Sequence, residues 1–284
     1  MAAHESIYEY YLHQHRNIQY YLELCAIQPE VELVHEFRLS IKKLRAFHKL
    51  TEQIFHDYKD EHIYIRHRVR QLYKVAGQLR DTQVQIHLLS LFQEQTGIEY
   101  AEFGKWLLKR EKKRISRFTK KPQQLVPQAT ALNIHHEVGN LLALAGDETI
   151  LNGAEKVLSQ LYEEAHSLAS GDMNDRNLHR VRTIIKQVRY ILNIMHHSYP
   201  DFLFGKLSVN SIREIEVAAG QWHDNLVRIE LLNRYMEKID PDNSTDKFKY
   251  QKLLNACKAE LDISYSETLA IVRKAILPQH FDPE

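Results

Sequence analysis

Two stretches of the chain carry the same row of basic side chains at the same spacing. A histidine is followed by cations three, seven and ten positions later, first in residues 34–50 and again in residues 178–194. The rows are His35, Arg38, Lys42 and Arg45, and His179, Arg182, Lys186 and Arg189. At about 100° per residue, each row falls within an arc of roughly 80° on a helix. Guanidinium and ammonium groups in such a row are suited to binding the oxygens of a phosphate polyanion.

Acidic residues that would offset these charges locally are scarce. Residues 178–194 contain no acid, and neither do residues 62–80, which add further cations. Like charges at helical spacing repel one another, whereas an ordinary solvated helix mixes the two signs. We therefore expect a polyanion to face these helices. Further candidate contacts are Lys43, Arg66, Arg70, Lys74 and Arg213, the last being the repeat counterpart of Arg70.

A third basic run covers residues 105–121, with nine cations and one acid. Its counterpart near residues 249–265 is much weaker, so we expect the run to be an ordinary solvated helix face. The sequence leaves open whether it joins the site.

An apolar stripe runs beside each basic row and predicts the helix face that packs in the core. The stripes are Val34, Phe37, Ile41 and Leu44, and Leu178, Val181, Ile185 and Val188. The cations therefore border the core rather than point directly away from it.

The whole chain carries an internal repeat. Residues 34–50 resemble residues 178–194 at an offset of 144, and residues 77–89 resemble residues 220–232 at an offset of 143. We predict one domain, 1–284, built from halves 1–120 and 130–284 that are joined by a linker, 121–129.

The fold class predicted from composition is all-α, because nine Gly and seven Pro in 284 residues leave room for long helices. Each half is expected to form an antiparallel bundle of four-helix type, and the two bundles to pack about a pseudo-two-fold axis. The predicted helices include 60–78 and 81–95 in the first half, and 130–144, 148–169, 206–221 and 223–238 in the second.

Two aspartates, Asp81 and Asp224, occupy equivalent repeat positions before predicted helices. We expect each to cap its helix, or to hold Arg80 or another arginine of the site in place.

The totals exclude some classes of protein. The formal charge of +1 predicts no general affinity for polyanions, so any such affinity must come from local clustering. Two cysteines, Cys25 and Cys257, form no CxxC pair and are expected to be small core residues. The sequence shows neither a signal peptide nor a membrane span, and we expect a soluble cytoplasmic protein.

The doubled patterns VHEFRLSIKKLRA and LHRVRTIIKQVRY, with GQLRD and GQWHD farther along, resemble the CHAD domain family, named for conserved histidines in an α-helical domain. The resemblance covers essentially the whole chain. It implies two pseudo-symmetric helical bundles around a basic central groove that binds inorganic polyphosphate, and association with polyphosphate granules. The contacts expected by position, with the neighbouring cations, are His35, Arg38, Lys42, Lys43, Arg45, Arg66, Arg70, Lys74, His179, Arg182, Lys186, Arg189 and Arg213. Lys42 and Lys43 stand where the family commonly has arginines, and Gln187 interrupts the second basic pair.

Histidines among such cations should be held in the neutral form in the unliganded protein, while a bound phosphate favours the imidazolium. We therefore expect binding to strengthen as the pH falls.

A di-iron site is a weaker interpretation, suggested by Glu32-x-x-His35 and Glu163-x-x-His166. The two pairs are not equivalent in the repeat, where Arg176 replaces the first glutamate. We expect no metal and no cofactor.

A phosphohydrolase of the HD type is suggested by His56-Asp57 and His223-Asp224, but Arg80 is the counterpart of His223 and cannot bind a metal. We expect no enzyme activity. A nucleic-acid-binding or phosphoprotein-binding helical module remains the alternative to polyphosphate binding.

Overall fold

The structure is a computed structural model that describes the backbone of residues 3–55, 63–120, 128–240 and 242–277. Side chains are described over the same ranges except at positions 3, 63–69 and 128–137. Within these ranges the chain forms helices and no strand, which confirms the all-α prediction. The helices are α1 Ala3–Ile27, α2 Val31–Ile54, α3 Ile63–Thr96, α4 Ala101–Thr119, α5 Gln128–Ser170, α6 Asp175–Ser198, α7 Val209–Met236 and α8 Ser244–Ile276.

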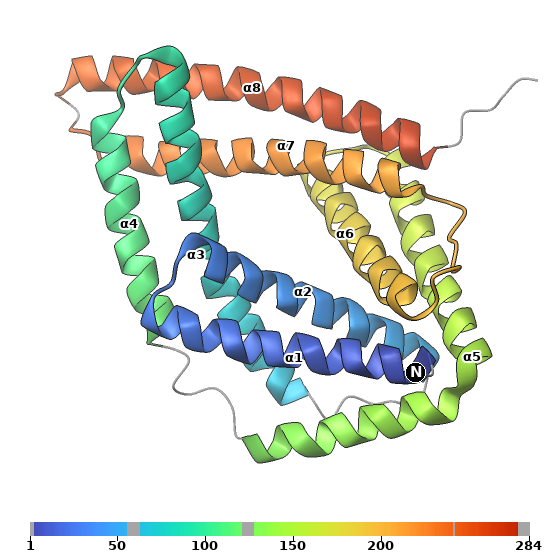
Figure 1. Cartoon of the computed structure of the whole chain (residues 1–284). Coiled ribbons are helices and arrows are strands. Elements are labelled where there is room, and N and C mark those ends of the chain that lie inside the picture. The colour runs from blue at the N-terminus through green and yellow to red at the C-terminus, as the bar shows by residue number, and fades with distance from the viewer. Residues whose placement is uncertain (1–2, 56–62, 121–127, 241, 278–284) are drawn as a thin grey trace, which may run out of the picture.

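Consecutive helices pair as four hairpins, α1 with α2, α3 with α4, α5 with α6, and α7 with α8 (Figure 1). The hairpins lie around a central region, and α2, α3, α6 and α7 are the helices nearest to it. Around this region α2 contacts α3 and α6, and α7 contacts the same two helices. The two basic rows predicted from the sequence therefore lie on neighbouring inner helices, α2 and α6.

The largest hydrophobic core joins hairpins from both halves of the repeat. It combines residues of α1 and α2 with residues of α5 and α6, and it includes parts of α7 and α8. All eight residues of the two predicted apolar stripes are buried, as expected. The first half also encloses a core of its own, in which Val34, Phe37 and Ile41 of α2 pack with residues of α1, α3 and α4. Leu44 of α2 and the whole α6 stripe belong to the largest core, which both halves share. The predicted two-fold relation between the halves stays a prediction.

The helix breaks predicted at Asp81 and Asp224 are wrong. The α3 and α7 helices run through these residues without interruption, so neither aspartate caps a helix. An aspartate inside a helix costs only a few tenths of a kcal/mol relative to most residues, and no proline or glycine forces a break there. The break predicted between 144 and 148 does exist as a kink in α5, where Gly146 has φ 70° and ψ 160°.

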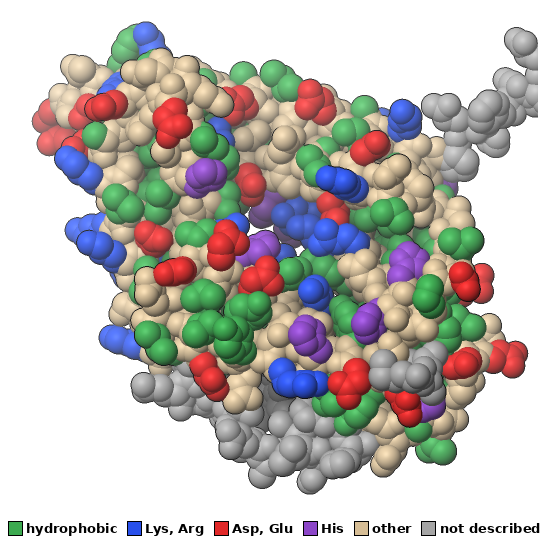
Figure 2. All heavy atoms as spheres, viewed as in Figure 1, with side chains coloured by type: hydrophobic (Ala, Val, Ile, Leu, Met, Phe, Trp, Pro, Cys, Tyr) green, Lys and Arg blue, Asp and Glu red, His purple; other side chains and the backbone are tan. Residues whose placement is uncertain are grey.

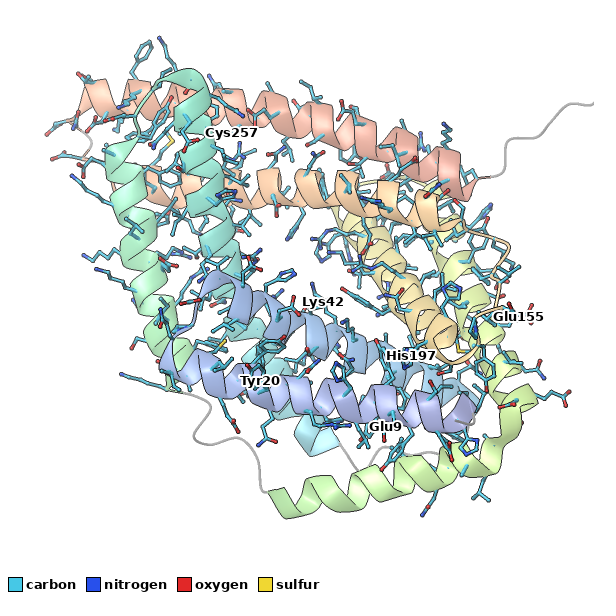
Figure 3. The ribbon with its side chains drawn as sticks, viewed as in Figure 1. Glu9, Tyr20, Lys42, Glu155, His197 and Cys257 are labelled. Atoms are coloured by element: carbon cyan, nitrogen blue, oxygen red, sulfur yellow. The ribbon has the colours of Figure 1, made fainter. Side chains whose placement is uncertain are left out.

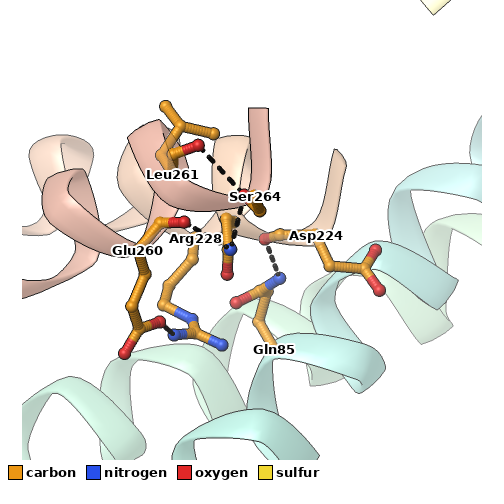
Figure 4. Close-up of polar contacts among 7 residues, drawn as sticks. Gln85, Asp224, Arg228, Glu260, Leu261 and Ser264 are labelled. Atoms are coloured by element: carbon orange, nitrogen blue, oxygen red, sulfur yellow. Dashed lines mark hydrogen bonds and ion pairs between the residues drawn. The ribbon is translucent and has the colours of Figure 1, made fainter. Parts of the chain in front are cut away.

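Polar contacts fix α7 between its neighbours near Asp224 (Figure 4). The buried Gln85 amide of α3 donates to the backbone oxygen of Asp224 over 2.8 Å. On the other side, Arg228 pairs with Glu260 of α8 at 2.8 Å, and Asn225 donates to Ser264 over 3.1 Å. These contacts set the position from which α7 presents its side chains to the central region.

Cys25 and Cys257 are both buried and free, which confirms the prediction that they are core residues. Burial raises the pKa of the Cys25 thiol to about 12. Across the described residues, no helix combines the length and the apolar character that a membrane crossing requires.

We expect Gly153→Val to lower the free energy of unfolding by about 1–3 kcal/mol, as overpacking does in dense cores. A Cβ at Gly153 would lie 2.6 Å from Cγ1 of Ile54 and 3.3 Å from its Cα, so α5 and α2 would have to separate. Urea unfolding measures the change. Gly205→Ala is the control, since a Cβ there meets nothing within 4 Å. Equal stability of the two variants would contradict the close packing of α2 on α5.

Candidate functional site

Five predicted cations from α2 and α6 come together where these two helices meet. Each of the other four acts electrostatically on the ammonium group of Lys42. We call the five residues the basic cluster: Arg38, Lys42, Arg182, Lys186 and Arg189. Figure 2 shows a hollow near the centre of one face, with Lys, Arg and His side chains inside it. In Figure 3, Lys42 lies on the side of α2 that faces α6 and α7.

The two lysines of the basic cluster are held in an unfavourable environment. Burial, followed by the charges of Lys186 and the neighbouring arginines, lowers the pKa of Lys42 to about 7. Burial and Arg182 lower the pKa of Lys186 to about 8, although the carboxylates of Glu216 and Asp224 act in the opposite direction. Both lysines are half-buried, and neither forms an ion pair or hydrogen bond with the described residues.

Arg38 is fixed by Tyr73 and by a glycine on α3. Its Nη1 donates to the backbone oxygen of Tyr73 over 2.8 Å, and its guanidinium lies 4.4 Å from the centre of the Tyr73 ring. A Cβ on Gly77 would lie 2.3 Å from the same Nη1, so a side chain at this position would displace the guanidinium of Arg38. Arg45 is exposed and lies 5.5 Å from the Tyr73 ring, next to Arg38.

Three carboxylates offset the basic cluster in part. Glu216 of α7, with a side chain only 10% exposed, pairs with Arg189 at 2.8 Å. This is the one ion pair between the basic cluster and an acid within the described residues. Burial raises the pKa values of Glu216, Asp81 and Asp224, and the neighbouring cations only partly counter it. Five cations against three acids leave a positive excess.

The predicted role of Asp81 and Asp224 in holding arginines agrees with the electrostatics, unlike their predicted role as caps. Asp81 interacts with Arg38, Arg114 and Arg182, and the strongest charged neighbour of Asp224 is Arg182. One aspartate from each half thus faces the same arginine of α6.

The pKa of each histidine near the basic cluster is lowered. For His35 the causes are burial and then the charge of Arg80, and for His179, whose ring is only partly desolvated, they are that desolvation and then the charge of Arg182. His223 of α7 lies 5.5 Å from His179 between ring centres, and burial with the charge of Arg182 lowers its pKa to about 3. His179 is exposed and also lines a pocket of about 570 Å³ at the N-terminus of α6.

Several buried polar atoms at the basic cluster lack a hydrogen-bond partner among the described residues. They are Nε of Arg182, Nε of Arg189, Nδ1 of His223 and Oε1 of Glu216. Buried polar groups nearly always have partners in folded proteins. The basic cluster therefore keeps unused hydrogen-bonding capacity as well as excess charge.

The other predicted contacts stay predictions. Arg70, Lys74 and Arg213 are exposed, and Lys43 is half-buried. Arg66 lies outside the residues whose side chains are described, and so do His56 and Asp57.

Most of the basic run of residues 105–121 is exposed on α4, as expected. Arg114 differs, because it donates to the backbone oxygen of Gln78 and to Oγ1 of Thr82, at 2.7 Å for the latter. Burial lowers its pKa to about 10 although Asp81 raises it. Asp81 interacts with Arg114 and also with Arg38 and Arg182 of the basic cluster, so Arg114 is linked to the site through this aspartate.

The sequence reasoning did not identify Tyr73 and Glu216, although the repeat contained a signal. They are 143 residues apart and so occupy equivalent positions, as do Arg45 and Arg189, which are 144 apart. In the first half Arg45 lies over the Tyr73 ring, and in the second Arg189 pairs with Glu216. The same pair of repeat positions is therefore in contact in both halves, through a cation–π contact in the first half and an ion pair in the second.

No group of three or more His, Cys, Asp or Glu side chains that could hold a metal ion occurs among the described residues. The pairs Glu32 with His35 and Glu163 with His166 therefore do not join into one site there. Metal binding at the basic cluster would also be opposed by its excess positive charge.

Comparison with known proteins identifies one family to which the sequence matches and solved structures that share its fold. A family model described as the CHAD domain matches residues 9–233. The crystal structure of the CHAD domain from the plant Ricinus communis is similar, with a TM-score of 0.69 and 17% identity over 96% of this chain and 92% of that chain. PptA from Streptomyces chartreusis is similar with a TM-score of 0.62 and 13% identity, over 96% of this chain and 100% of that chain. No curated protein matches the sequence.

We expect Lys42→Met to stabilise the unliganded protein at pH 7 by about 1–3 kcal/mol, because it removes a cation that folding brings beside four others. Since the pKa of Lys42 is lower in the folded state, its destabilising effect is largest below pH 7. The effect disappears toward the pKa of the unfolded chain, near 10.5.

Thermal unfolding at low salt, measured at pH 7 and pH 10, tests this expectation. Lys258→Met on α8 is the control, because Lys258 is exposed and lies far along the chain from the basic cluster. A loss of stability in Lys42→Met, or a gain equal at both pH values, would contradict the electrostatic account.

Proposed function

The chain belongs to the CHAD domain family, and from this premise we propose that it binds inorganic polyphosphate through the basic cluster without altering it chemically. The expected ligand contacts are Arg38, Lys42, Arg182, Lys186 and Arg189, with His179 at the edge. The hollow of Figure 2 is the proposed basic groove. Association with polyphosphate granules in the cytoplasm is part of the same proposal.

The observation that carries this proposal is the meeting of Lys42 with the α6 cations. Bringing like charges together in a half-buried position opposes folding unless an anion joins them. Lys42 and Lys186 form no ion pair with the described residues, so their ammonium groups can bind phosphate oxygens without first losing a protein partner.

Polyphosphate fits the basic cluster better than nucleic acid does. Single-stranded nucleic acids are usually held by aromatic rings on which the bases stack, in addition to cations. Two tyrosine rings lie at the basic cluster, and arginines cover both: Arg38 and Arg45 lie over Tyr73, and Arg189 lies over the buried Tyr190. A polyanion without bases needs the cations alone.

We expect the triple variant Lys42→Gln/Arg182→Gln/Lys186→Gln to bind long-chain polyphosphate at least about a hundredfold more weakly at low salt, since charge-assisted hydrogen bonds contribute about 1.5–3 kcal/mol each. The slope of log affinity against log salt should flatten by about 2, at roughly 0.7 per lost phosphate contact. Fluorescence anisotropy over a salt series measures both quantities.

The matched control is Lys109→Gln/Lys112→Gln/Lys113→Gln, which removes the same charge from exposed positions of α4. It should retain most of the affinity. If the control loses as much affinity as the triple variant, the site lies on α4 and the proposal fails. Competition with tRNA tests the alternative: if tRNA displaces polyphosphate at equal phosphate concentration, the protein is a nucleic-acid-binding module.

Binding should weaken as the pH rises from 7 to 9. In the free protein the pKa of Lys42 is about 7 and that of Lys186 about 8, and a bound polyanion raises both. Above pH 7 binding must therefore take up protons, and we expect about a tenfold loss of affinity or more by pH 9. The charged groups that face these lysines are Arg38 of α2, Arg182 and Arg189 of α6, and Glu216 and Asp224 of α7.

Titration calorimetry in two buffers of different ionisation enthalpy measures the proton uptake directly. The variant Lys42→Arg/Lys186→Arg keeps both charges but cannot lose its protons in this range. It should bind equally well at pH 7 and pH 9. If this variant keeps the pH dependence of the wild type, the lysines are not its source.

A further inference from the structure

Lys42 combines chemical features that a residue used only for charge does not need. Its Nζ forms no hydrogen bond or ion pair with the described residues, and it is not among the buried atoms that solvent cannot reach. The side chain lies on the face of α2 toward α6 and α7 (Figure 3). Desolvation and neighbouring cations are two ways in which proteins make a lysine amine nucleophilic, and Lys42 has both.

The repeat counterpart of Lys42 provides an internal comparison. Lys186 faces Glu216 and Asp224 of α7, whose carboxylates favour its charged form. The groups that act most strongly on Lys42 are all cations, and Glu216 is a weaker neighbour. The pKa of both lysines is lowered, so part of each carries near neutral pH the free electron pair that nucleophilic attack requires, and two carboxylates favour the charged form of Lys186.

We propose that Lys42 Nζ is a site of covalent acylation by acyl phosphates, small molecules in which a carbonyl carbon carries a phosphate leaving group. The proposal rests on the anion binding proposed above, since the basic cluster would hold the phosphate part of the reagent. Arg182 and Lys186 bind that phosphate, and the carbonyl carbon then lies next to Lys42.

The reaction needs no further reagent. The neutral amine of Lys42 attacks the carbonyl carbon, the new C–N bond forms, and the C–O bond to phosphate breaks. The electron pair of that bond leaves with the phosphate oxygen, and the amine proton passes to the departing phosphate. With acetyl phosphate, the products are acetyl-lysine and hydrogen phosphate, and the total charge of −2 is the same before and after. The surrounding cations stabilise the negative charge that develops on the carbonyl oxygen and on the departing phosphate oxygen.

Acylation would also regulate the proposed binding. It removes one of the five positive charges of the basic cluster and fills part of the space next to Arg182 with an uncharged amide. Polyphosphate should then bind more weakly to the modified protein, while bound polyphosphate should shield Lys42 from the reagent.

The test uses acetyl phosphate and the full chain at pH 7.5 and low salt, with the extent of acetylation at each lysine followed over time by peptide mass spectrometry. We expect Lys42 to react at least about tenfold faster than the exposed Lys258, because the basic cluster holds the phosphate of the reagent next to Lys42. Lys42 should also react faster than Lys186. Excess inorganic phosphate should slow the reaction at Lys42 and leave Lys258 unaffected.

The variant Arg182→Gln, checked by circular dichroism, should lower the rate at Lys42 and leave that at Lys258 unchanged. Equal rates at Lys42 and Lys258 in the wild type, or no protection by inorganic phosphate, would overturn the proposal.

This result is separable from that for polyphosphate. Selective, phosphate-sensitive acetylation in a protein that fails to bind polyphosphate would reject the proposed function and keep the acylation site. Polyphosphate binding without selective acetylation would keep the proposed function and reject the acylation site.

Discussion

Like charges that face one another in a half-buried place must be held together by the rest of the structure. In this protein the charges are the cations of α2 and α6, and the apolar stripes beside them hold them in place. Val34, Phe37 and Ile41 on α2 pack in a core of the first half, and their counterparts on α6 pack in the core that both halves share. Leu44 of α2 lies in that shared core as well, so the apolar packing fixes each basic row on its helix and holds α2 against α6. The hydrophobic contact and the electrostatic repulsion are thus linked by helical geometry.

The carboxylates of α3 and α7 limit this repulsion without removing it. Asp81 and Asp224 both act on Arg182, and Glu216 pairs with Arg189. A basic cluster fully matched by acids would leave nothing for a ligand, whereas one with no acids would strongly oppose folding. Three acids against five cations lie between these limits, which suits a protein that must fold before it binds an anion.

The two halves of the repeat do not contribute equally to the site. Arg45 lies over the ring of Tyr73, while its counterpart Arg189 forms an ion pair with Glu216. Lys186 likewise has carboxylates near it, and the strongest influences on Lys42 are cations. The charge of Lys42, which comes from the first half, is therefore less offset by neighbouring acids than the charge of Lys186. This difference explains why the proposed covalent chemistry falls on one lysine of an equivalent pair.

The sequence by itself determined the local features: the all-α class, the repeat, the buried stripes and the faces on which the basic rows lie. These follow from helical periodicity, which depends on neighbours within a few residues. The sequence wrongly predicted that helices begin near Asp81 and Asp224, because local signals favoured helix starts there. In the structure both aspartates lie within continuous helices, where cations of α2, α4 and α6 interact with them. Only the tertiary structure decided that Lys42 meets Lys186 and that Tyr73 and Glu216 join the basic cluster. Such contacts connect residues far apart in the chain, and they depend on how hairpins from the two halves pack against one another.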